Sequence, residues 1–314
     1  MANVLAQNLS EYTESNKDKL IAEIVAGSKT PQIMAIQTGI KFKEEVGRMK
    51  TDVVFQDGAG CGRTPNGTTY IDTRTLTVGQ IKVQENICPD DLTQSYLASK
   101  LGKGSDNRTL PFEQVYTDLK VKKITYANEI AIWQGDTDST DANLNKFDGF
   151  LKIIDAEADV VHGNTGSVTS YDASNAVSVM DAMDAAIPTQ LKTADGTRPI
   201  AILCGLDWFS TYALALRNAN LFHYDGKAMN YEIIIPGSTT KLIGLDGLTG
   251  TDRMVAGVIG GEGNFVIGTD LKNEQEKFRM FWSEDDEVLK FDAKWKLGTQ
   301  IRVPEELVEF TLSA

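Results

Sequence analysis

Side chains that could bind a metal are most concentrated in the polar segment 135–145. Oxygen-bearing residues follow one another there at the short spacing of a calcium loop: Asp136, Asp138, Asp141, Asn143 and Asn145. An EF-hand loop needs glycine at its sixth position for a sharp turn and glutamate at its twelfth as a bidentate ligand. Counted from Asp136, those positions hold Asp141 and Phe147. We interpret the segment as a solvated acidic loop and keep a calcium-dependent binding module as the weaker alternative.

The glycines at positions 260, 261, 263 and 268 are the next candidates, because glycine-rich loops can cradle phosphate groups. The sequence contains no GxxxxGK motif followed by serine or threonine, and these glycines do not match GxGxxG at the start of a helix. The apolar residues that follow, Phe265–Ile267, are typical of a strand. The glycines therefore predict a hairpin turn.

Histidine and cysteine, the usual bases, nucleophiles and zinc ligands, are scarce. The chain has two histidines, His162 and His223, and no HExxH motif, His–Cys cluster or GxSxG motif. Its three cysteines are too few and too scattered for a disulfide framework, although Cys61 and Cys88 bracket one segment and could approach each other. We expect reduced thiols, no metal or cofactor, and no enzymatic activity.

The composition limits the classes of partner. With 31 basic and 44 acidic residues, the 314-residue chain carries a formal net charge of -13. Such a charge repels nucleic acid phosphates, so tight DNA or RNA binding is not expected. No secretory signal is apparent, and no apolar run approaches the ~20 residues that span a membrane. We expect folding in a reducing cytoplasm.

The elements around these residues point to assembly instead of chemistry. Thr51–Ile87 predicts a long two-stranded ribbon, with an apolar run at Val53–Phe55, a turn at Pro65–Gly67 and a return limb of alternating polarity. An isolated two-stranded ribbon is marginally stable in water, because one apolar face and half of its backbone groups stay exposed. A neighbouring copy of the chain is a natural support for it.

Two helices are predicted near this ribbon. Leu20, Ile21, Ile24 and Val25 form a narrow apolar stripe between a cap at Ser15 and a stop at Gly27. The polar arm that carries this helix is expected either to rest on another subunit or to be partly disordered. A longer helix, Pro111–Trp133, would form a structural spine. Its predicted core-facing positions follow a helical period: Phe112, Val115, Leu119, Tyr126, Ile130 and Trp133.

The remaining chain predicts a mixed α+β fold. From about residue 160 helices and strands alternate, with a helix stopped by Pro188 and another carrying Trp208, Tyr212 and Leu216 on one side. The last 40 or so residues are rich in strand patterns. We expect both ends of the chain to share one domain, with roughly 160–270 inserted as another.

This order of parts resembles the major capsid proteins of tailed bacteriophages, which share the Hong Kong 97-type fold. Four stretches carry the resemblance: LTVGQIKVQENICPDDLTQSYL at 76–97, PFEQVYTDLKVKKITYANEIAIWQGD at 111–136, KFDGFLKIIDA at 146–156 and FDAKWKLGTQIRVPEELVEF at 291–310. The resemblance implies an arm, an extended loop (E-loop), a peripheral P-domain with the spine helix, an inserted axial α/β A-domain and closing P-domain strands. These would span 1–50, 51–87, 88–159, 160–270 and 271–314.

The same resemblance implies a structural role in a virion. Hexamers and pentamers would close an icosahedral shell around double-stranded DNA, assembled in the host bacterial cytoplasm without a membrane. An encapsulin-type compartment with the same fold is the alternative. The short arm implies a separate scaffolding protein, with a portal and possibly decoration proteins as further partners.

The tip of the ribbon is the predicted contact with a neighbouring subunit: Arg63, Pro65, Asn66, Gly67, Thr68 and Tyr70. Some relatives crosslink an E-loop lysine to a neighbour. Lys82 is the one lysine between Val53 and Pro89 and would lie at the base of the ribbon, so we do not expect a crosslink.

Overall fold

The computed structural model describes residues 15–59, 62–63, 65–88, 112–192, 198–219, 230–270 and 277–313. Cys61 and His223 lie outside these residues.

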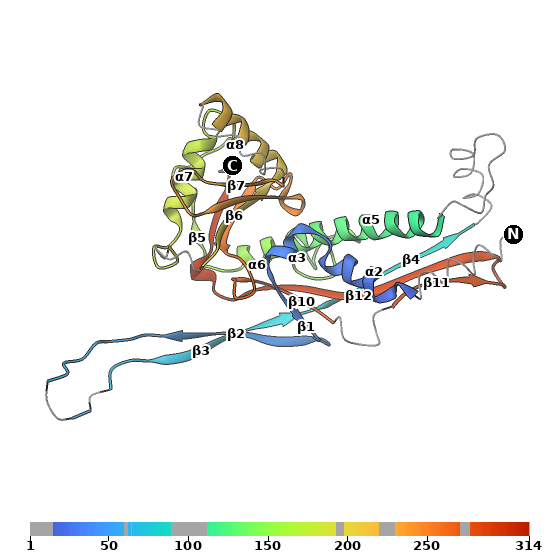
Figure 1. Ribbon diagram of the computed structural model, residues 1–314, viewed down its shortest axis with the longest axis horizontal. Helices are drawn as coiled ribbons and strands as arrows, with labels where there is room; N and C mark the ends of the chain where they lie inside the picture. The colour runs from blue at the N-terminus through green and yellow to red at the C-terminus, as the bar shows by residue number, and fades with distance from the viewer. Residues whose placement is uncertain are drawn as a thin grey trace.

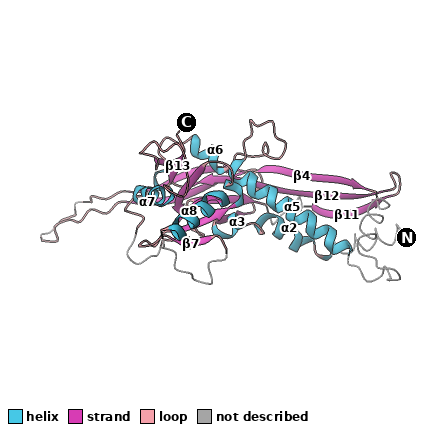
Figure 2. Cartoon of the chain, turned by 90° about the horizontal axis from the view of Figure 1, so that it is seen from above, coloured by secondary structure: helices cyan, strands magenta, loops and turns pink. Residues whose placement is uncertain are grey.

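A long sheet runs through the body of the molecule (Figures 1 and 2). Its central strand is β12 (Val288–Ile301), which pairs along one edge with β4 (Gly79–Ile87). Along its other edge lie first β11 (Lys277–Ser283) and then β10 (Phe265–Thr269), both antiparallel to it. The N-terminal strand β1 (Ala35–Thr38) pairs with β10 in parallel. Strands from the first 90 residues therefore share one sheet with strands from residues 265–301.

The spine helix α5 (Phe112–Gln134) lies along this sheet, and α2 (Lys17–Ala26) packs beside it (Figures 1 and 2). Short helices α3 (Lys29–Ile33) and α6 (Phe150–Asp155) join the same layer. The apolar stripe of α2 is buried and Gly27 caps the helix, but its N-cap is Asn16 instead of Ser15. The arm was expected to rest on another subunit; from α2 onward it packs on its own chain.

The predicted buried face of α5 is wrong in part. Trp133 is fully buried, but Leu119 and Tyr126 are 60% and 52% exposed. The buried side chains lie on another side of the helix: Thr117, Val121, Ile124, Asn128, Glu129, Ala131 and Ile132. Two of its polar residues bond backbone groups of neighbouring helices: Asn128 donates to Ile24 O of α2, and Glu129 accepts from the backbone N–H of Thr30 in α3.

A second sheet stands at one end of the long one, with α7 (Ala176–Ala186) and α8 (Leu206–Asn218) packed with it (Figure 1). Helix α7 ends before Pro188, and α8 buries the predicted Trp208, Tyr212 and Leu216. The strand order is β5 (Val161–His162), β13 (Val308–Thr311), β9 (Arg253–Val258), β6 (Ile200–Gly205), β8 (Lys241–Leu245) and β7 (Glu232–Ile234).

The chain passes from one sheet to the other, which changes the expectation for the glycine turn. The glycine turn at 260–263 does not close a hairpin, since β9 belongs to the second sheet and β10 to the long one. His162 lies in β5 beside β13. The C-terminal strand β13 belongs to the second sheet. The boundaries of the inserted domain, expected at residues 160 and 270, remain predictions.

The ribbon occupies a different part of the chain than expected. It consists of β2 (Lys43–Thr51) and β3 (Thr69–Thr77), paired in antiparallel register from Lys43–Thr77 to Thr51–Thr69. The segment predicted as its base, 79–87, leaves the ribbon as β4 and joins the long sheet. The alternation of polar and apolar residues continues through Val78, where β3 ends and β4 begins. The sequence pattern therefore did not show that the chain passes there from the ribbon to the long sheet.

Candidate assembly surfaces

The base of the ribbon rests on its own subunit. Val46 and Leu76, one from each strand, are 4% and 0% exposed and pack in a small apolar cluster with Ile40, Val78 and Val266. Burying such side chains contributes about 1.5–3 kcal/mol each. The base therefore does not depend on a neighbouring subunit for its support, although the sequence suggested that it would.

Ion pairs and hydrogen bonds fix the direction of the ribbon. Arg48 of β2 pairs with Glu306, and Lys50 Nζ lies 3.3 Å from Glu305 Oε2. On β3, Arg74 pairs with Glu157. Because these contacts bind both strands to the body of the subunit, the ribbon leaves it in one orientation.

Beyond the paired strands, residues 52–59 and 65–68 belong to an outer loop, and these described limbs project far from the body (Figure 1). Asp52 N donates to Thr68 O at 2.8 Å where the pairing ends. Next along the chain, the side chains of Val53, Val54 and Phe55 are 71%, 44% and 96% exposed. Contiguous exposed apolar residues of this kind mark interaction sites. Sequence reasoning noted this apolar run but did not assign it to the contact.

The residues predicted to contact a neighbour all lie on the return limb. Arg63, Pro65, Asn66, Gly67 and Thr68 are exposed in the outer loop, while Tyr70 lies in β3 opposite Lys50 and is 57% exposed. The predicted turn at Pro65–Gly67 is wrong. Its backbone is extended, with no positive φ at Asn66 or Gly67, because the strands are no longer paired there and no tight reversal is needed.

The acidic loop at 136–148 encloses a lysine. Lys152 Nζ lies 2.5 Å from Asp136 Oδ1, 2.7 Å from Asp138 Oδ2 and 3.0 Å from Asp148 Oδ1. Hydrogen bonds from Lys152 and from the backbone N–H of Asp138 hold the pKa of Asp136 below its usual value. The ammonium group takes the place that a cation would need, which argues against the calcium-binding alternative. Among the described residues, no His, Cys, Asp and Glu side chains form a metal-binding group of three.

The structure describes two cysteines, of which Cys88 is exposed and Cys204 is buried. Cys204 of β6 is fully buried, and burial raises the pKa of its thiol, so it is not an activated nucleophile. His162 is exposed in β5. In the part of the chain that the structure describes, no helix is long and apolar enough to cross a membrane.

No family model and no curated protein matches the sequence. Solved structures do match in backbone path. A chain of the satellite phage P4 procapsid, determined with its size determination protein, matches with a TM-score of 0.63 at 12% identity, over 95% of this chain and 91% of that one. The capsid of cyanophage A-1(L) matches with a TM-score of 0.56 at 12% identity, over 89% and 90%. The chain has the fold of tailed-phage capsid proteins.

This capsid fold also occurs in a cellular compartment. The holo-SrpI encapsulin complex of Synechococcus elongatus matches with a TM-score of 0.50 at 9% identity, over 90% of this chain and 86% of that one. At such low identities the likeness concerns the fold and not the side chains. The capsid fold is therefore established here, and the choice between shells depends on other observations.

Proposed function

We propose that the protein is the major capsid protein of a tailed double-stranded DNA phage. Hexamers and pentamers of it would form an icosahedral shell around the genome. The observation that carries the proposal is the outer loop, whose described limbs project from a ribbon anchored to its own subunit and expose Val53–Phe55. In a chain with the capsid fold, such an element is suited to cover a neighbouring subunit.

In this proposal the ribbon and outer loop act as the E-loop, α5 and the long sheet as the P-domain, and the second sheet as the A-domain. The net charge of -13 suits a shell that must let packaged DNA slide past its wall. A separate scaffolding protein, a portal and possibly decoration proteins would assist assembly in the host cytoplasm. Each contact can be modest because symmetry repeats it over the shell.

Electron microscopy of the full chain, alone and co-expressed with a scaffolding protein, tests the proposal. We expect rings or closed shells of uniform size. Persistent monomers under both conditions would refute it.

An encapsulin-type shell is the second candidate, favoured by the likeness to the SrpI complex. The contents of particles purified from their natural host decide between the two. Nuclease-protected double-stranded DNA supports the phage shell, whereas a single enclosed enzyme supports the encapsulin.

A further inference from the structure

The dipeptide Asn66–Gly67 brings together two residues that can react with each other without an enzyme. It is the one place in the sequence where glycine directly follows asparagine. The backbone nitrogen of the residue after an asparagine can attack the side-chain carbonyl carbon, which closes a five-membered succinimide ring. A glycine at that position has no Cβ to obstruct the approach and permits unusual backbone conformations. The sequence thus offers one favourable position for this reaction.

The structure leaves both reacting groups free. Asn66 and Gly67 are exposed and lie outside the helices and strands, on the return limb of the outer loop. Strand pairing ends beside them, where Asp52 N donates to Thr68 O at 2.8 Å. Within the described part of the chain, neither the N–H of Gly67 nor the side-chain amide of Asn66 makes a hydrogen bond. Asn66 can therefore rotate into the reactive conformation without breaking a hydrogen bond of its own.

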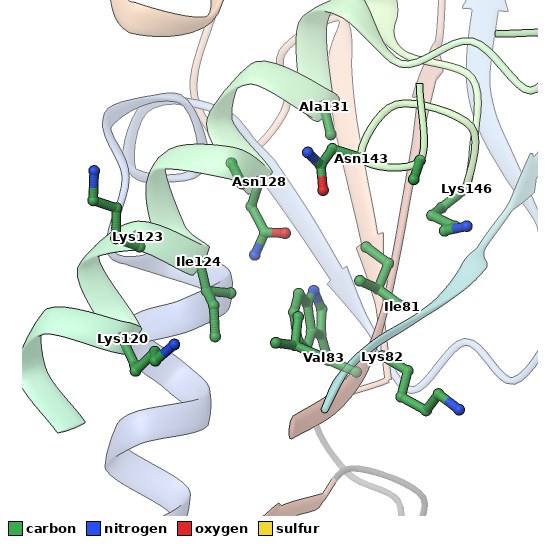
Figure 3. A pocket seen from close by; sticks show the side chains of 13 residues that line it. Ile81, Lys82, Val83, Lys120, Lys123, Ile124, Asn128, Ala131, Asn143 and Lys146 are labelled. Atoms are coloured by element: carbon green, nitrogen blue, oxygen red, sulfur yellow. The ribbon is translucent and has the colours of Figure 1, made fainter. Parts of the chain in front are cut away.

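Asparagines elsewhere in the fold lack one or more of these conditions. Asn128 and Asn143 line a pocket of about 270 Å³ between α5 and β4, where Figure 3 shows their side chains. Asn128 is buried, and the nitrogen that follows it belongs to Glu129 inside α5, where backbone N–H groups are hydrogen-bonded. Asn143 is exposed, but the N–H of the following Leu144 donates to Asp141 O at 3.1 Å. In both cases the attacking nitrogen is engaged.

The outer loop also holds an aspartate before a glycine, Asp57–Gly58, and both of these residues are exposed. An ionised carboxylate is a weaker electrophile than an amide. Oδ1 of Asp57 also accepts a hydrogen bond from the N–H of Ala59 at 2.9 Å, which holds the side chain in place. Asn66 is therefore the more reactive of the two positions.

We propose that Asn66 is a site of spontaneous deamidation. The backbone nitrogen of Gly67 loses its proton to hydroxide and attacks Cγ of Asn66, so that a new C–N bond forms. The Cγ–Nδ2 bond breaks, and Nδ2 leaves as ammonia with a proton from solvent. Water then opens the succinimide at either carbonyl carbon, which gives aspartate or isoaspartate at this position. Either product adds one negative charge, and isoaspartate also lengthens the backbone by one carbon atom.

The reaction alters a limb that the proposed function places against a neighbouring subunit. Burying an added charge in such a contact is costly unless it is paired. Subunits that wait before assembly should therefore lose assembly competence as Asn66 reacts, whereas a shell that covers the limb should protect it. This consequence rests on the proposed function, but the deamidation itself does not.

Peptide mapping by mass spectrometry tests the deamidation on the unassembled full-length subunit. After incubation in warm, mildly alkaline buffer, we expect the peptide with Asn66 to convert to a mixture of aspartate and isoaspartate. Isoelectric focusing should show the gain of one negative charge, and conversion should be faster at higher pH because the Gly67 nitrogen must lose its proton. An Asn66 that stays unaltered would overturn the proposal.

Two controls separate this reaction from general damage. Asn66→Gln keeps an amide but must close a six-membered ring, so its conversion should be at least severalfold slower. Asn164 is the internal control, because its Nδ2 donates to Thr311 O at 2.8 Å and its Oδ1 accepts from Val168 N at 2.8 Å. Equal conversion of Asn66 and Asn164 would also overturn the proposal.

An assembly comparison tests the consequence for the shell. Unaltered and Asn66→Gln subunits are aged alike and then assembled, and the yield of particles is measured by sedimentation. Ageing should lower the yield of the unaltered subunits and spare Asn66→Gln. Equal yields would refute the effect on assembly, while peptide mapping still decides the deamidation. If fresh subunits form no shells, the proposed function fails and the mapping result stands by itself.

Discussion

The ammonium group of Lys296 lies 2.9 Å from a carboxylate oxygen of Asp270, and the two side chains are 3% and 0% exposed. Lys296 Nζ also donates to the backbone oxygen of Lys41 at 2.8 Å, just before the ribbon begins. This buried pair therefore connects the central strand of the long sheet to the start of β2. Its loss should weaken the attachment of the ribbon as well as the sheet.

Replacing Lys296 with methionine should lower the free energy of unfolding by about 3–5 kcal/mol, because it leaves the carboxylate of Asp270 buried and uncompensated. Urea denaturation measures the change. The double variant Lys296→Met with Asp270→Leu should recover part of the loss. Lys290→Met, which breaks an exposed pair with Asp286, is the control and should cost about 1 kcal/mol or less. Equal losses for the two single variants would contradict the prediction.

Gly298 allows the corner between β3 and β4 to cross the central strand. A Cβ at this position would lie 2.2 Å from Thr77 O and 2.9 Å from Val78 Cα. Gly298→Ala should therefore destabilise the fold by roughly 1–3 kcal/mol, through a forced shift of backbone. In Gly58→Ala the added Cβ meets no atom within 4 Å, so its unfolding free energy should change little. Thermal and urea unfolding of both variants provide the comparison.

Glu129 should make stability depend on pH. It is 2% exposed in α5 and accepts hydrogen bonds from the backbone N–H and hydroxyl of Thr30. Burial raises its pKa, and those hydrogen bonds offset the effect only in part. The folded state therefore keeps its proton at pH values where the unfolded state, with a pKa of about 4.3, has lost it.

The stabilising contribution of Glu129 is consequently largest below the unfolded pKa and is lost as pH rises through the folded pKa. Between about pH 4 and pH 7, the free energy of unfolding should fall less in Glu129→Gln than in the unaltered protein. The exposed Glu44→Gln controls for the loss of one charge. An unaltered pH profile in Glu129→Gln would refute the assignment.

Lys152 should control the ionisation of the acidic loop. Its hydrogen bond is the largest cause of the lowered pKa of Asp136. Lys152→Met should raise that pKa toward about 3.9, as observed by NMR titration of the carboxyl carbon. Because the folded pKa lies below the unfolded one, the stabilisation holds above the unfolded pKa and is lost as pH falls through the folded value. Lys146→Met is the control: it removes another lysine charge of the same loop and should leave the pKa of Asp136 unchanged.

The outer loop should be dispensable for folding and required for assembly. Deleting Pro65–Thr68 removes exposed residues of the outer loop with no regular secondary structure, so circular dichroism and the unfolding midpoint should change little. Assembly should fall sharply in sedimentation and electron microscopy. Normal shells from the deletion variant would show that the return limb takes no part in the contact.

In the helices of the second sheet, the spacing of apolar residues is enough to predict the buried face. The stripe of Trp208, Tyr212 and Leu216 is buried as predicted, because one side of α8 faces an apolar core shared with β6, β8 and α7. In α5 the same reasoning selected Leu119 and Tyr126, which are exposed. That helix packs against α2 and the loop at 246–248, and its buried Asn128 and Glu129 serve backbone groups that periodicity does not register.

By itself, the sequence determined the mixed α+β class, the positions of most helices and strands, and the resemblance to capsid proteins. These follow from local preferences and from the spacing of apolar residues along the chain. Only the tertiary structure decided that 79–87 leaves the ribbon for the long sheet and that Lys152 occupies the acidic loop. These contacts join residues that are far apart in the sequence. Local sequence patterns are compatible with several such arrangements, and only packing in the folded chain selects one of them.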